Sequence, residues 1–298
     1  MAPVDVVVVS YNSEAHLRAL VEPLSSAPGL NVIVVDSASR DGTLATVQNL
    51  PITAVPLEHN RGFAHACNIG WRRGESPFVL FLNPDATVGV DDIGRLVAAA
   101  EEPHVGAAAP RIVGPTGALE YSLRRFPRLR TTYAQALFLH RFFPRASWSD
   151  ELIRSEEAYE QPSSPEWVSG ACLLVSRRAL EEIGGLDEGF FLYCEDIDLC
   201  KRLRDAGMDI RFVPDATAVH EGGASAPRAA LLPVLASSRV RYAQLHRGRP
   251  AALLERLGIA LGAVTHAIVS RGGRTARTGH LRAMRVAFWP SPKAPADP

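Results

Sequence analysis

The chain has 298 residues, of which 47% are hydrophobic, and equal numbers of acidic and basic side chains, 32 of each. This composition predicts a globular protein with one large core and excludes a chain that is mainly disordered. The spacing of its four cysteines matches neither a disulfide framework nor a paired zinc site, so we expect reduced thiols. The start, MAPVDVVVVSYN, lacks the basic flank and cleavage site of a signal peptide, which favours a cytoplasmic protein.

Apolar strands and helical segments alternate in the first part of the chain. We expect strands at 4–10, 31–36, 52–56 and 78–82, and helices at 13–26, 43–50 and 62–73, with Ser13 as an N-cap. Such alternation predicts an α/β fold whose parallel strands place ligands beyond their carboxyl ends. Polar clusters follow three of these strands, at 10–12, 36–39 and 83–85, so we expect them to meet at one edge of the sheet.

The regular alternation ends near residue 110. Residues 111–125 resemble a hairpin around Gly114, Pro115 and Gly117, and 126–165 is irregular, as in a loop that contacts an acceptor. We expect further strands at 167–175, 210–213 and 217–220, and helices at 177–183 and 197–206.

The last part of the chain, from residue 224, has a helical and basic sequence, with expected breaks near 248–250 and 271–274. It holds twelve lysines and arginines against two acidic residues, which suggests an anionic partner or a solvated tail. The apolar stretch 257–269 is too short for a transmembrane span; it could lie in a membrane interface or cover the rest of the protein. Nucleic-acid binding is not expected, because aromatic residues are not interleaved with the arginines.

Three single residues are candidates for binding. Asp36 could accept hydrogen bonds from a base or ribose, although the same residues also suit a turn. Asp85 could hold a divalent cation against substrate phosphates, since hard cations prefer carboxylate oxygen. His220 follows a predicted strand and could bind a metal through neutral imidazole, or be structural.

Three carboxylates, Glu195, Asp196 and Asp198, crowd the start of the helix expected at 197–206. Acidic residues are favoured in a first helical turn, so capping is the alternative interpretation. Crowded carboxylates raise one another's pKa, which suits one of them to take a proton from a hydroxyl.

Together these segments resemble the family-2 inverting glycosyltransferases of the GT-A fold. The resemblance covers roughly residues 4–223 and rests on seven segments in order: VVVSYNS, VVDSASRDGT, NRGFAHACNIG, LFLNPDA, WVSGACLLVSR, GGLDEGFFLYCEDIDLCKRLRDAG and HEGGAS. It implies an α/β catalytic domain over 1–223 with a Rossmann-like sheet that binds a nucleotide-sugar. A helical, arginine-rich C-terminal extension over 224–298 would then associate with a membrane.

The resemblance also implies roles for single residues. Asp196 matches the catalytic base, and Trp167 and Glu195 match positions on the acceptor side. Asp85 and His220 match ligands of a divalent metal, Mg²⁺ or Mn²⁺, whereas Asn83 replaces a frequent Asp, which puts its direct contact with the metal in doubt. The positions that match donor-binding residues are Ser10, Tyr11, Asn12, Asp36, Arg61, Gly62, Asn68, Asn83 and Asp85.

Within the family, GGLDEGFFLYCEDIDLCKR and RVRYAQLHRG are most similar to bacterial rhamnosyltransferases that use dTDP-rhamnose. We therefore expect single-displacement transfer of L-rhamnose to GlcNAc on a polyprenyl diphosphate, by a peripheral protein on the inner face of an anionic membrane. A transferase that uses UDP-galactofuranose or UDP-GlcNAc is the alternative. A second alternative is a non-catalytic module that binds a sugar nucleotide or a membrane. The sequence leaves the oligomeric state open.

Overall fold

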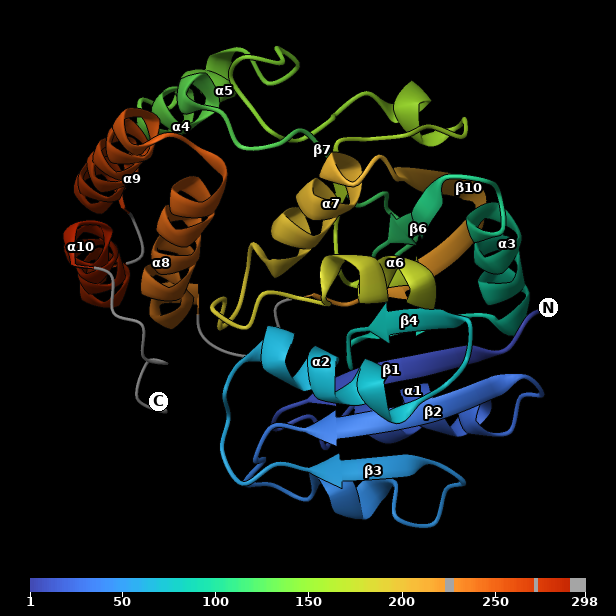
Figure 1. The fold of residues 1–298 in the computed structure, drawn as a ribbon. Helices are drawn as coiled ribbons and strands as arrows, with labels where there is room; N and C mark the ends of the chain where they lie inside the picture. Colours follow the sequence, from blue (N-terminus) through green and yellow to red (C-terminus); the bar gives the residue numbers. More distant parts are fainter. Residues whose placement is uncertain (223–227, 271–272, 290–298) are drawn as a thin grey trace.

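The structure is a computed structural model that describes residues 1–222, 228–270 and 273–289 (Figure 1). Its centre is an eight-stranded sheet in the order β3-β2-β1-β4-β9-β6-β10-β5, and β7 and β8 form a second, two-stranded sheet. The strands are β1 (Val4–Ser10), β2 (Leu30–Asp36), β3 (Thr53–Pro56), β4 (Phe78–Leu82), β5 (Ala86–Val88), β6 (Val105–Val113), β7 (Leu123–Arg124), β8 (Trp167–Val168), β9 (Cys172–Ser176) and β10 (Asp209–His220).

The neighbouring strands β3, β2, β1 and β4 are parallel, as the alternation predicted. The sheet as a whole is mixed, because β9 runs antiparallel between β4 and β6. All seven residues of β1 are buried, and its alternate side chains enter different cores on the two faces. This two-sided burial explains why five of the seven residues of the strand are valine.

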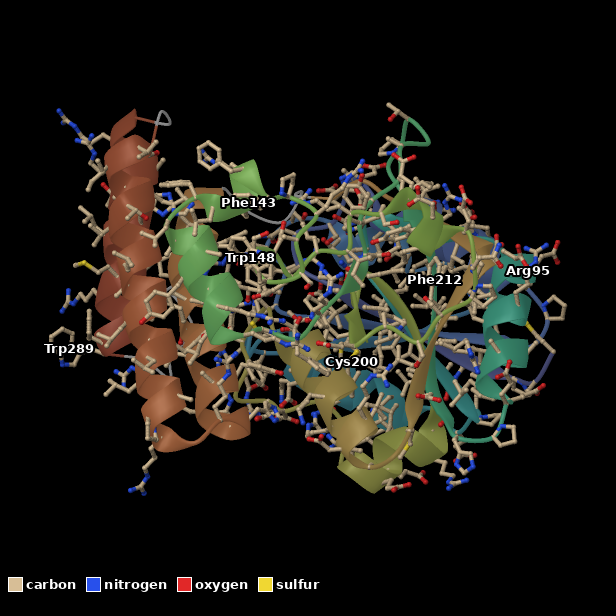
Figure 2. All side chains as sticks on the ribbon, turned by 90° about the horizontal axis from the view of Figure 1, so that it is seen from above. Arg95, Phe143, Trp148, Cys200, Phe212 and Trp289 are labelled. Atoms are coloured by element: carbon tan, nitrogen blue, oxygen red, sulfur yellow. The ribbon has the colours of Figure 1, made fainter. Side chains whose placement is uncertain are left out.

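Helices cover both faces of the sheet. One core contains residues of α2 (Phe63–Arg73), α6 (Arg177–Ile183) and α7 (Glu195–Asp205), and the other contains residues of α1 (Leu17–Ser25) and α3 (Val90–Ala100). The four cysteines are free and buried, in agreement with reduced thiols. Figure 2 shows Cys200 and Phe212 inside the part of the molecule that contains the sheet, whereas Trp289 projects outward from the C-terminal helices.

Two predicted helices in the first part of the chain were too long. The first helix begins at Leu17 and not near residue 13, and its N-cap is His16. Ser13 lies in the preceding turn, where its carbonyl accepts hydrogen bonds from the backbone N–H groups of His16 and Leu17. The helix expected at 43–50 is a single 3₁₀ turn, η1 (Thr43–Thr46).

The expected strands and hairpin in the second half also differ in detail. The strand predicted at 167–175 is broken into β8 and β9, whereas the two strands predicted at 210–213 and 217–220 are one irregular strand, β10. The turn around Gly114 forms, but β7 pairs with β8 and not with β6. The segment 126–165 contains α4 (Leu129–Ala136), α5 (Leu139–Phe142) and η2 (Glu156–Tyr159).

The C-terminal part consists of α8 (Arg228–His246), α9 (Arg249–Val269) and α10 (Gly273–Phe288), with breaks where they were expected. These helices pack on one another and, through α9, on α4. In Figure 1 they stand on the side toward which β2, β3 and β4 point. The predicted domain boundary at residue 223 falls outside the described residues, so this division stays a prediction.

Helix α9 is longer than the apolar stretch 257–269 that it contains. With 21 residues it is, in the described part of the chain, the one helix that is long and apolar enough to cross a membrane. The stretch 257–269 alone is still shorter than a span, so the expectation holds for the stretch but does not cover the whole helix. Of the apolar window of α9, 33% is buried against the rest of the chain.

Candidate active site

Ser10 and Asp36 end the neighbouring strands β1 and β2, and the hydroxyl of Ser10 donates a hydrogen bond of 2.9 Å to Asp36 Oδ1. The backbone N–H and the hydroxyl of Ser39 donate two further hydrogen bonds, of 2.9 and 2.6 Å, to the same carboxylate. Asp36 is therefore buried and held in one orientation. An ionised carboxylate has roughly four acceptor positions, so it can still accept a donor from a ligand.

The loop after β1 is tied to the loop after β2. The backbone N–H of Asn12 donates to Ser39 Oγ at 2.8 Å, and Asn12 Oδ1 accepts from the backbone N–H of Arg40 at 2.9 Å. Asn12 has a φ of 50°, in the left-handed region that asparagine tolerates. Tyr11, next to it, is half-buried. The two clusters thus form one surface, as expected.

Asp85 and His220 come together although they are far apart in sequence. His220 pairs with Ala86 across β10 and β5, which places its Nε2 atom 3.4 Å from Asp85 Oδ1. Its other ring nitrogen, Nδ1, lies 3.2 Å from Glu120 Oε2. Glu120 therefore orients the imidazole so that Nε2 faces Asp85, an arrangement common among metal-binding histidines.

Charge stabilises this pair. The hydrogen bond to Asp85 raises the pKa of His220 against the effect of burial, and Glu120 adds to the increase. Burial alone would raise the pKa of Asp85, but the hydrogen bond and charge of His220, with the charge of His16, lower it.

The pair fits a divalent ion that takes its other ligands from substrate and water. No group of three or more His, Cys, Asp and Glu side chains in the described residues is arranged to hold a metal ion by itself. Magnesium-like ions in nucleotide sites need only one or two protein ligands besides the phosphates. The backbone N–H of Asn83 bonds to the carbonyl of Ala171, which fixes the turn that carries Asp85.

Asp196 lies in the first turn of α7, after an abrupt change of backbone direction. Tyr193 and Cys194 have φ values of 68° and 66°, which non-glycine residues seldom adopt. The Asp196 carboxylate accepts hydrogen bonds from the backbone N–H of Gly170, at 3.1 Å, and of Ile197, at 2.8 Å. Burial raises the pKa of Asp196, and the Gly170 hydrogen bond and the charge of Arg124 oppose this increase.

The segment Gly170–Ala171, which lies between β8 and β9, connects the turn that carries Asp85 to the carboxylate of Asp196. The carbonyl of Ala171 accepts from Asn83, and the N–H of Gly170 donates to Asp196. A Cβ atom at Gly170 would lie 3.2 Å from the Cβ of Asp196, so a larger residue would displace the carboxylate. The break in the predicted strand therefore brings the expected base to the edge that carries Asp85.

Glu195 differs from its neighbour Asp196. It is 7% exposed, and its Oε2 atom has no hydrogen-bond partner among the described residues. Burial, followed by the charge of Asp196, raises the pKa of Glu195 to about 8. Two backbone N–H groups stabilise the charged form of Asp196, whereas no N–H group reaches Oε2 of Glu195. We therefore infer that Asp196 is the ionised member and Glu195 the protonated member of this pair of carboxyl groups.

Trp167 lies deeper than an acceptor-lining residue would suggest. It is 5% exposed, its Nε1 donates to the carbonyl of Arg125 at 2.9 Å, and the Arg124 guanidinium lies 5.0 Å from its ring centroid. Any influence of Trp167 on an acceptor would therefore act through Arg124.

Arg61 and Gly62 occupy the start of α2, beside the loop that precedes the base. Gly62 has a φ of 100°, and a Cβ atom there would lie 2.4 Å from the carbonyl oxygen of Phe191. Only glycine allows this close approach. Arg61 is mostly exposed, with Glu188 at 4.0 Å, so its guanidinium is accessible to a ligand.

Asn68, expected to bind the donor, has a structural role here. Its Nδ2 donates to the carbonyl of Leu186 and to Glu188, and its Oδ1 accepts from the N–H of Leu186 and from Trp71 Nε1. All four hydrogen-bonding positions of the side-chain amide are thus occupied by the protein. Asn68 thus fastens α2 to the loop that precedes α7, and its expected contact with a donor stays a prediction.

Three residues near the site were missed from the sequence: Glu120, Arg124 and Glu188. Glu188 lies within GGLDEGFF, part of a segment that carries the family resemblance, where its charge could have drawn attention. Glu120 and Arg124 lie in an irregular segment with no recognisable spacing, and only the folded chain places them beside His220 and Asp196.

Known proteins share this architecture. The chain matches the model of Glycosyl transferase family 2 over residues 5–184. It is 35% identical over 239 residues to N-acetylglucosaminyl-diphospho-decaprenol L-rhamnosyltransferase of Mycobacterium tuberculosis, covering 75% of this chain and 77% of that protein. It is 25% identical over 231 residues to rhamnosyltransferase WbbL of Escherichia coli, covering 72% of this chain and 82% of that protein.

Among solved structures, mannosyltransferase PcManGT of Pyrobaculum calidifontis has a TM-score of 0.60 at 18% identity, covering 97% of this chain and 87% of that one. This likeness shows a shared GT-A fold. The family match and the two relatives, both named rhamnosyltransferases, define the chain as a glycosyltransferase. The chain belongs to glycosyl transferase family 2 and is an inverting glycosyltransferase.

Proposed function

We propose that this chain transfers L-rhamnose from dTDP-rhamnose to a hydroxyl of GlcNAc carried on a polyprenyl diphosphate. The donor and acceptor are supported by the relative from Mycobacterium tuberculosis, whose name specifies rhamnosyl transfer to GlcNAc-diphospho-decaprenol. The observation that carries the chemistry is the connection of Asp85 and Asp196 through Gly170–Ala171.

The donor would lie along the carboxyl edge of β1, β2 and β4. Asp36 and the loop residues Tyr11 and Asn12 would bind the nucleoside, and Arg61 would reach the diphosphate. A Mg²⁺ or Mn²⁺ ion held by Asp85 and His220 would neutralise the charge that develops on the leaving diphosphate. PcManGT, which shares the fold, was solved in complex with GDP-Man and Mn²⁺, and this supports a divalent ion here.

Transfer would proceed by one in-line displacement. Asp196, ionised and held by two backbone N–H groups, accepts the proton of the acceptor hydroxyl while that oxygen attacks the anomeric carbon. The bond to the diphosphate breaks as the new bond forms, so the configuration inverts. Glu195, which keeps its proton at neutral pH, can donate a hydrogen bond to the acceptor without competing for the hydroxyl proton.

A donor screen tests this function. The purified chain is incubated with Mn²⁺, a short-chain prenyl-diphosphate-GlcNAc, and dTDP-rhamnose, UDP-galactofuranose or UDP-GlcNAc in turn, and products are identified by mass spectrometry. We expect a rhamnosylated product from dTDP-rhamnose alone. Turnover of either UDP-sugar without turnover of dTDP-rhamnose would refute the proposed donor.

We also propose that the protein is cytoplasmic and attaches to an anionic membrane surface through its C-terminal helices. Leu253, Leu257, Val264 and Ile268 are exposed along one side of α9. Exposed arginines of α10, such as Arg282, and the exposed Trp289 lie on the neighbouring helix. Apolar side chains flanked by arginines and tryptophan are typical of helices that lie in a membrane interface.

Flotation with liposomes tests the attachment. Wild type should float with phosphatidylglycerol vesicles more than with neutral phosphatidylcholine vesicles, and Ile268→Ser together with Trp289→Ser should reduce this flotation. Equal flotation of the wild type and the double variant would remove the proposed contact.

A further inference from the structure

A groove of about 500 Å³ lies where the start of α4 meets the turn between α8 and α9. It is lined by Pro127, Arg128, Leu129, Arg130 and Arg247, so three of its five lining residues are arginines. Arg247 lies in the turn between α8 and α9, whereas the other four residues precede or begin α4. The groove therefore exists only because the C-terminal helices are docked on the segment 126–165.

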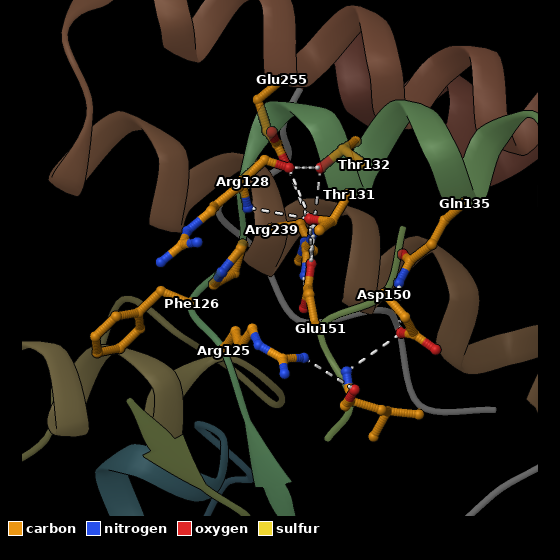
Figure 3. A network of polar contacts seen from close by, with 12 residues as sticks. Arg125, Phe126, Arg128, Thr131, Thr132, Gln135, Asp150, Glu151, Arg239 and Glu255 are labelled. Carbon is orange, nitrogen blue, oxygen red and sulfur yellow. Dashed lines mark hydrogen bonds and ion pairs between the residues drawn. The ribbon is translucent and has the colours of Figure 1, made fainter. Parts of the chain in front are cut away.

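Carboxylates near the groove do not balance these arginines. Arg128 pairs with Glu166 at 2.6 Å, and Arg247 pairs with Glu255 at 2.9 Å. Glu255 is shared, because it also accepts a hydrogen bond from Thr132 and lies 3.4 Å from Arg239. Figure 3 shows Arg239 between Glu151 and Glu255, with Arg128 extending away from this cluster.

Arg130 contributes a charge that the structure does not neutralise. Its side chain is exposed, and it forms no ion pair with a carboxylate of the described residues. Guanidinium groups bind phosphate oxygens through two parallel N–H donors, which makes arginine well suited to planar recognition of phosphates. Three arginines around one groove thus provide a site for an anion with more than one phosphate.

The groove lies next to the acceptor side of the base. Arg124, whose charge acts on Asp196, is four residues before Arg128, and four residues span at most about 14 Å. Glu166, the partner of Arg128, directly precedes Trp167, whose ring lies against Arg124. An acceptor that places a sugar hydroxyl at Asp196 can therefore extend its anomeric substituent toward the groove.

Exposed apolar side chains lie beyond the end of α4 that is opposite the groove. Leu137, Phe142 and Phe143 follow the end of that helix and are all more than half exposed. Helix α4 has eight residues, so this apolar surface begins about 12 Å from its start. The carboxylate base, the arginine-lined groove and the apolar surface thus follow one another. This order matches the sugar, the diphosphate and the lipid of a prenyl-linked acceptor.

We propose that Arg128, Arg130 and Arg247 bind the diphosphate of the lipid-linked acceptor. This inference rests on the proposed function, since it assumes that the acceptor sugar is carried on a diphosphate. A phospholipid headgroup offers the same phosphate chemistry, so the experiment must separate the two sources.

The variant Arg130→Gln is suited to the test, because Arg130 has no intramolecular ion pair among the described residues to lose. Transfer is measured with two acceptors, a short-chain prenyl-diphosphate-GlcNAc and the octyl glycoside of GlcNAc, which lacks phosphate. Arg130→Gln should raise KM for the diphosphate acceptor by about tenfold or more, the usual effect of losing a hydrogen bond to a charged group. KM for the octyl glycoside should not change, and Arg130→Lys should recover part of the loss.

Arg73→Gln is the matched control, because Arg73 is an exposed arginine at the far end of α2 and should leave both KM values unchanged. Equal changes with both acceptors for Arg130→Gln, or no change with either, would overturn the assignment. Reduced flotation with phosphatidylglycerol vesicles at an unchanged KM would also overturn it and assign the groove to membrane phosphate.

Direct binding separates this inference from the proposed function. The affinity of the short-chain prenyl-diphosphate-GlcNAc for the wild type and for Arg130→Gln is measured by calorimetry in the presence of dTDP and Mn²⁺. Weaker binding by the variant supports the groove even where no rhamnose is transferred, and equal binding overturns it. Absence of transfer by wild type that still binds the probe would refute the proposed reaction alone.

Discussion

The two carboxyl groups at the start of α7 have opposite surroundings. Asp196 receives two backbone hydrogen bonds, whereas Glu195 Oε2 is buried without a partner among the described residues. In the proposed mechanism these neighbouring residues of one helix perform different tasks, with Asp196 as the ionised base and Glu195 as a neutral acid. The environment of each group, and not the residue type, decides which one ionises.

Replacing the base tests this assignment. Asp196→Asn keeps the size of the side chain but removes the basic carboxylate, and its one amide oxygen can accept only one of the two backbone hydrogen bonds, so kcat should fall by about 10²- to 10⁴-fold. Because the carboxylate acts only as the hydroxyl reacts, the affinity for dTDP should stay the same. Rates of rhamnose transfer and dTDP titrations measure both quantities, and a variant with full activity would contradict the role.

The pKa of Glu195 predicts a specific pH dependence of stability. Its pKa is about 8 in the folded chain against an ordinary value of 4.5, so between these values the unfolded chain ionises while the folded chain keeps the proton. The free energy of unfolding of wild type therefore falls as pH rises through this window. Glu195→Gln removes the effect and should gain stability relative to wild type, by a few kcal/mol at pH 8.

Thermal unfolding of wild type and Glu195→Gln between pH 5 and pH 8 measures this difference. Tm curves that stay parallel over the range would show that burial does not shift the pKa of Glu195.

Sequence reasoning identified some of these residues and not others. The motif that contains Asp196 and the pair formed by Asp85 and His220 were found because their segments are characteristic of the family. Their companions Glu120 and Arg124 could not be found, since each acts across a distance that only the fold closes. The structural role of Asn68 could not be found either, because its hydrogen bonds to Leu186 and Glu188 are tertiary.

At the scale of elements, α8 holds the loop that leads into the base. The Ser238 hydroxyl donates to the carbonyl of Leu192 at 2.7 Å, directly before the left-handed residues Tyr193 and Cys194. Arg241 pairs with Asp187, and His246 lies 2.7 Å from Asp198 on α7. The C-terminal helices therefore contribute to the geometry of the catalytic loop.

Arg239 forms partly buried ion pairs that link α8 to both α9 and the segment 126–165 (Figure 3). Arg239→Met would leave the buried carboxylates of Glu151 and Glu255 short of a partner, which typically costs about 3–5 kcal/mol. Urea unfolding measures the loss. Arg282→Met, at an exposed position of α10, should change stability by less than about 0.5 kcal/mol. Similar small losses in both variants would show that the cluster does not stabilise the docking.

The boundaries of elements were predictable where one strand or helix is defined by its own residues. β1, β4 and α6 occur as expected, because continuous apolar runs and the glycines after residue 183 mark their ends. The break between β8 and β9 depends on contacts of Gly170 and Ala171 with distant residues. The docking of α8 through ion pairs likewise has no signal within α8 itself.

At the scale of the whole molecule, the candidate site is built from residues of both halves of the chain. Asp85 comes from the first half of the chain and His220 from β10, so the proposed metal-dependent binding of the donor would require strands from both halves of the chain. Asp85→Ala should reduce the affinity for dTDP in Mn²⁺ to the level measured with EDTA. Asp215→Ala, which removes an exposed carboxylate from the same strand as His220, is the control and should leave the metal effect intact. A metal effect that persists in Asp85→Ala would exclude Asp85 as a ligand.

A crystal structure of the protein with dTDP and Mn²⁺ is the most direct measurement of the arrangement. We expect the ion between Asp85 and His220, the thymine or ribose within hydrogen-bonding distance of Asp36, and the Asp196 carboxylate facing the terminal phosphate from the acceptor side. An ion bound elsewhere, or an Asp196 side chain that points away from the nucleotide, would contradict the account.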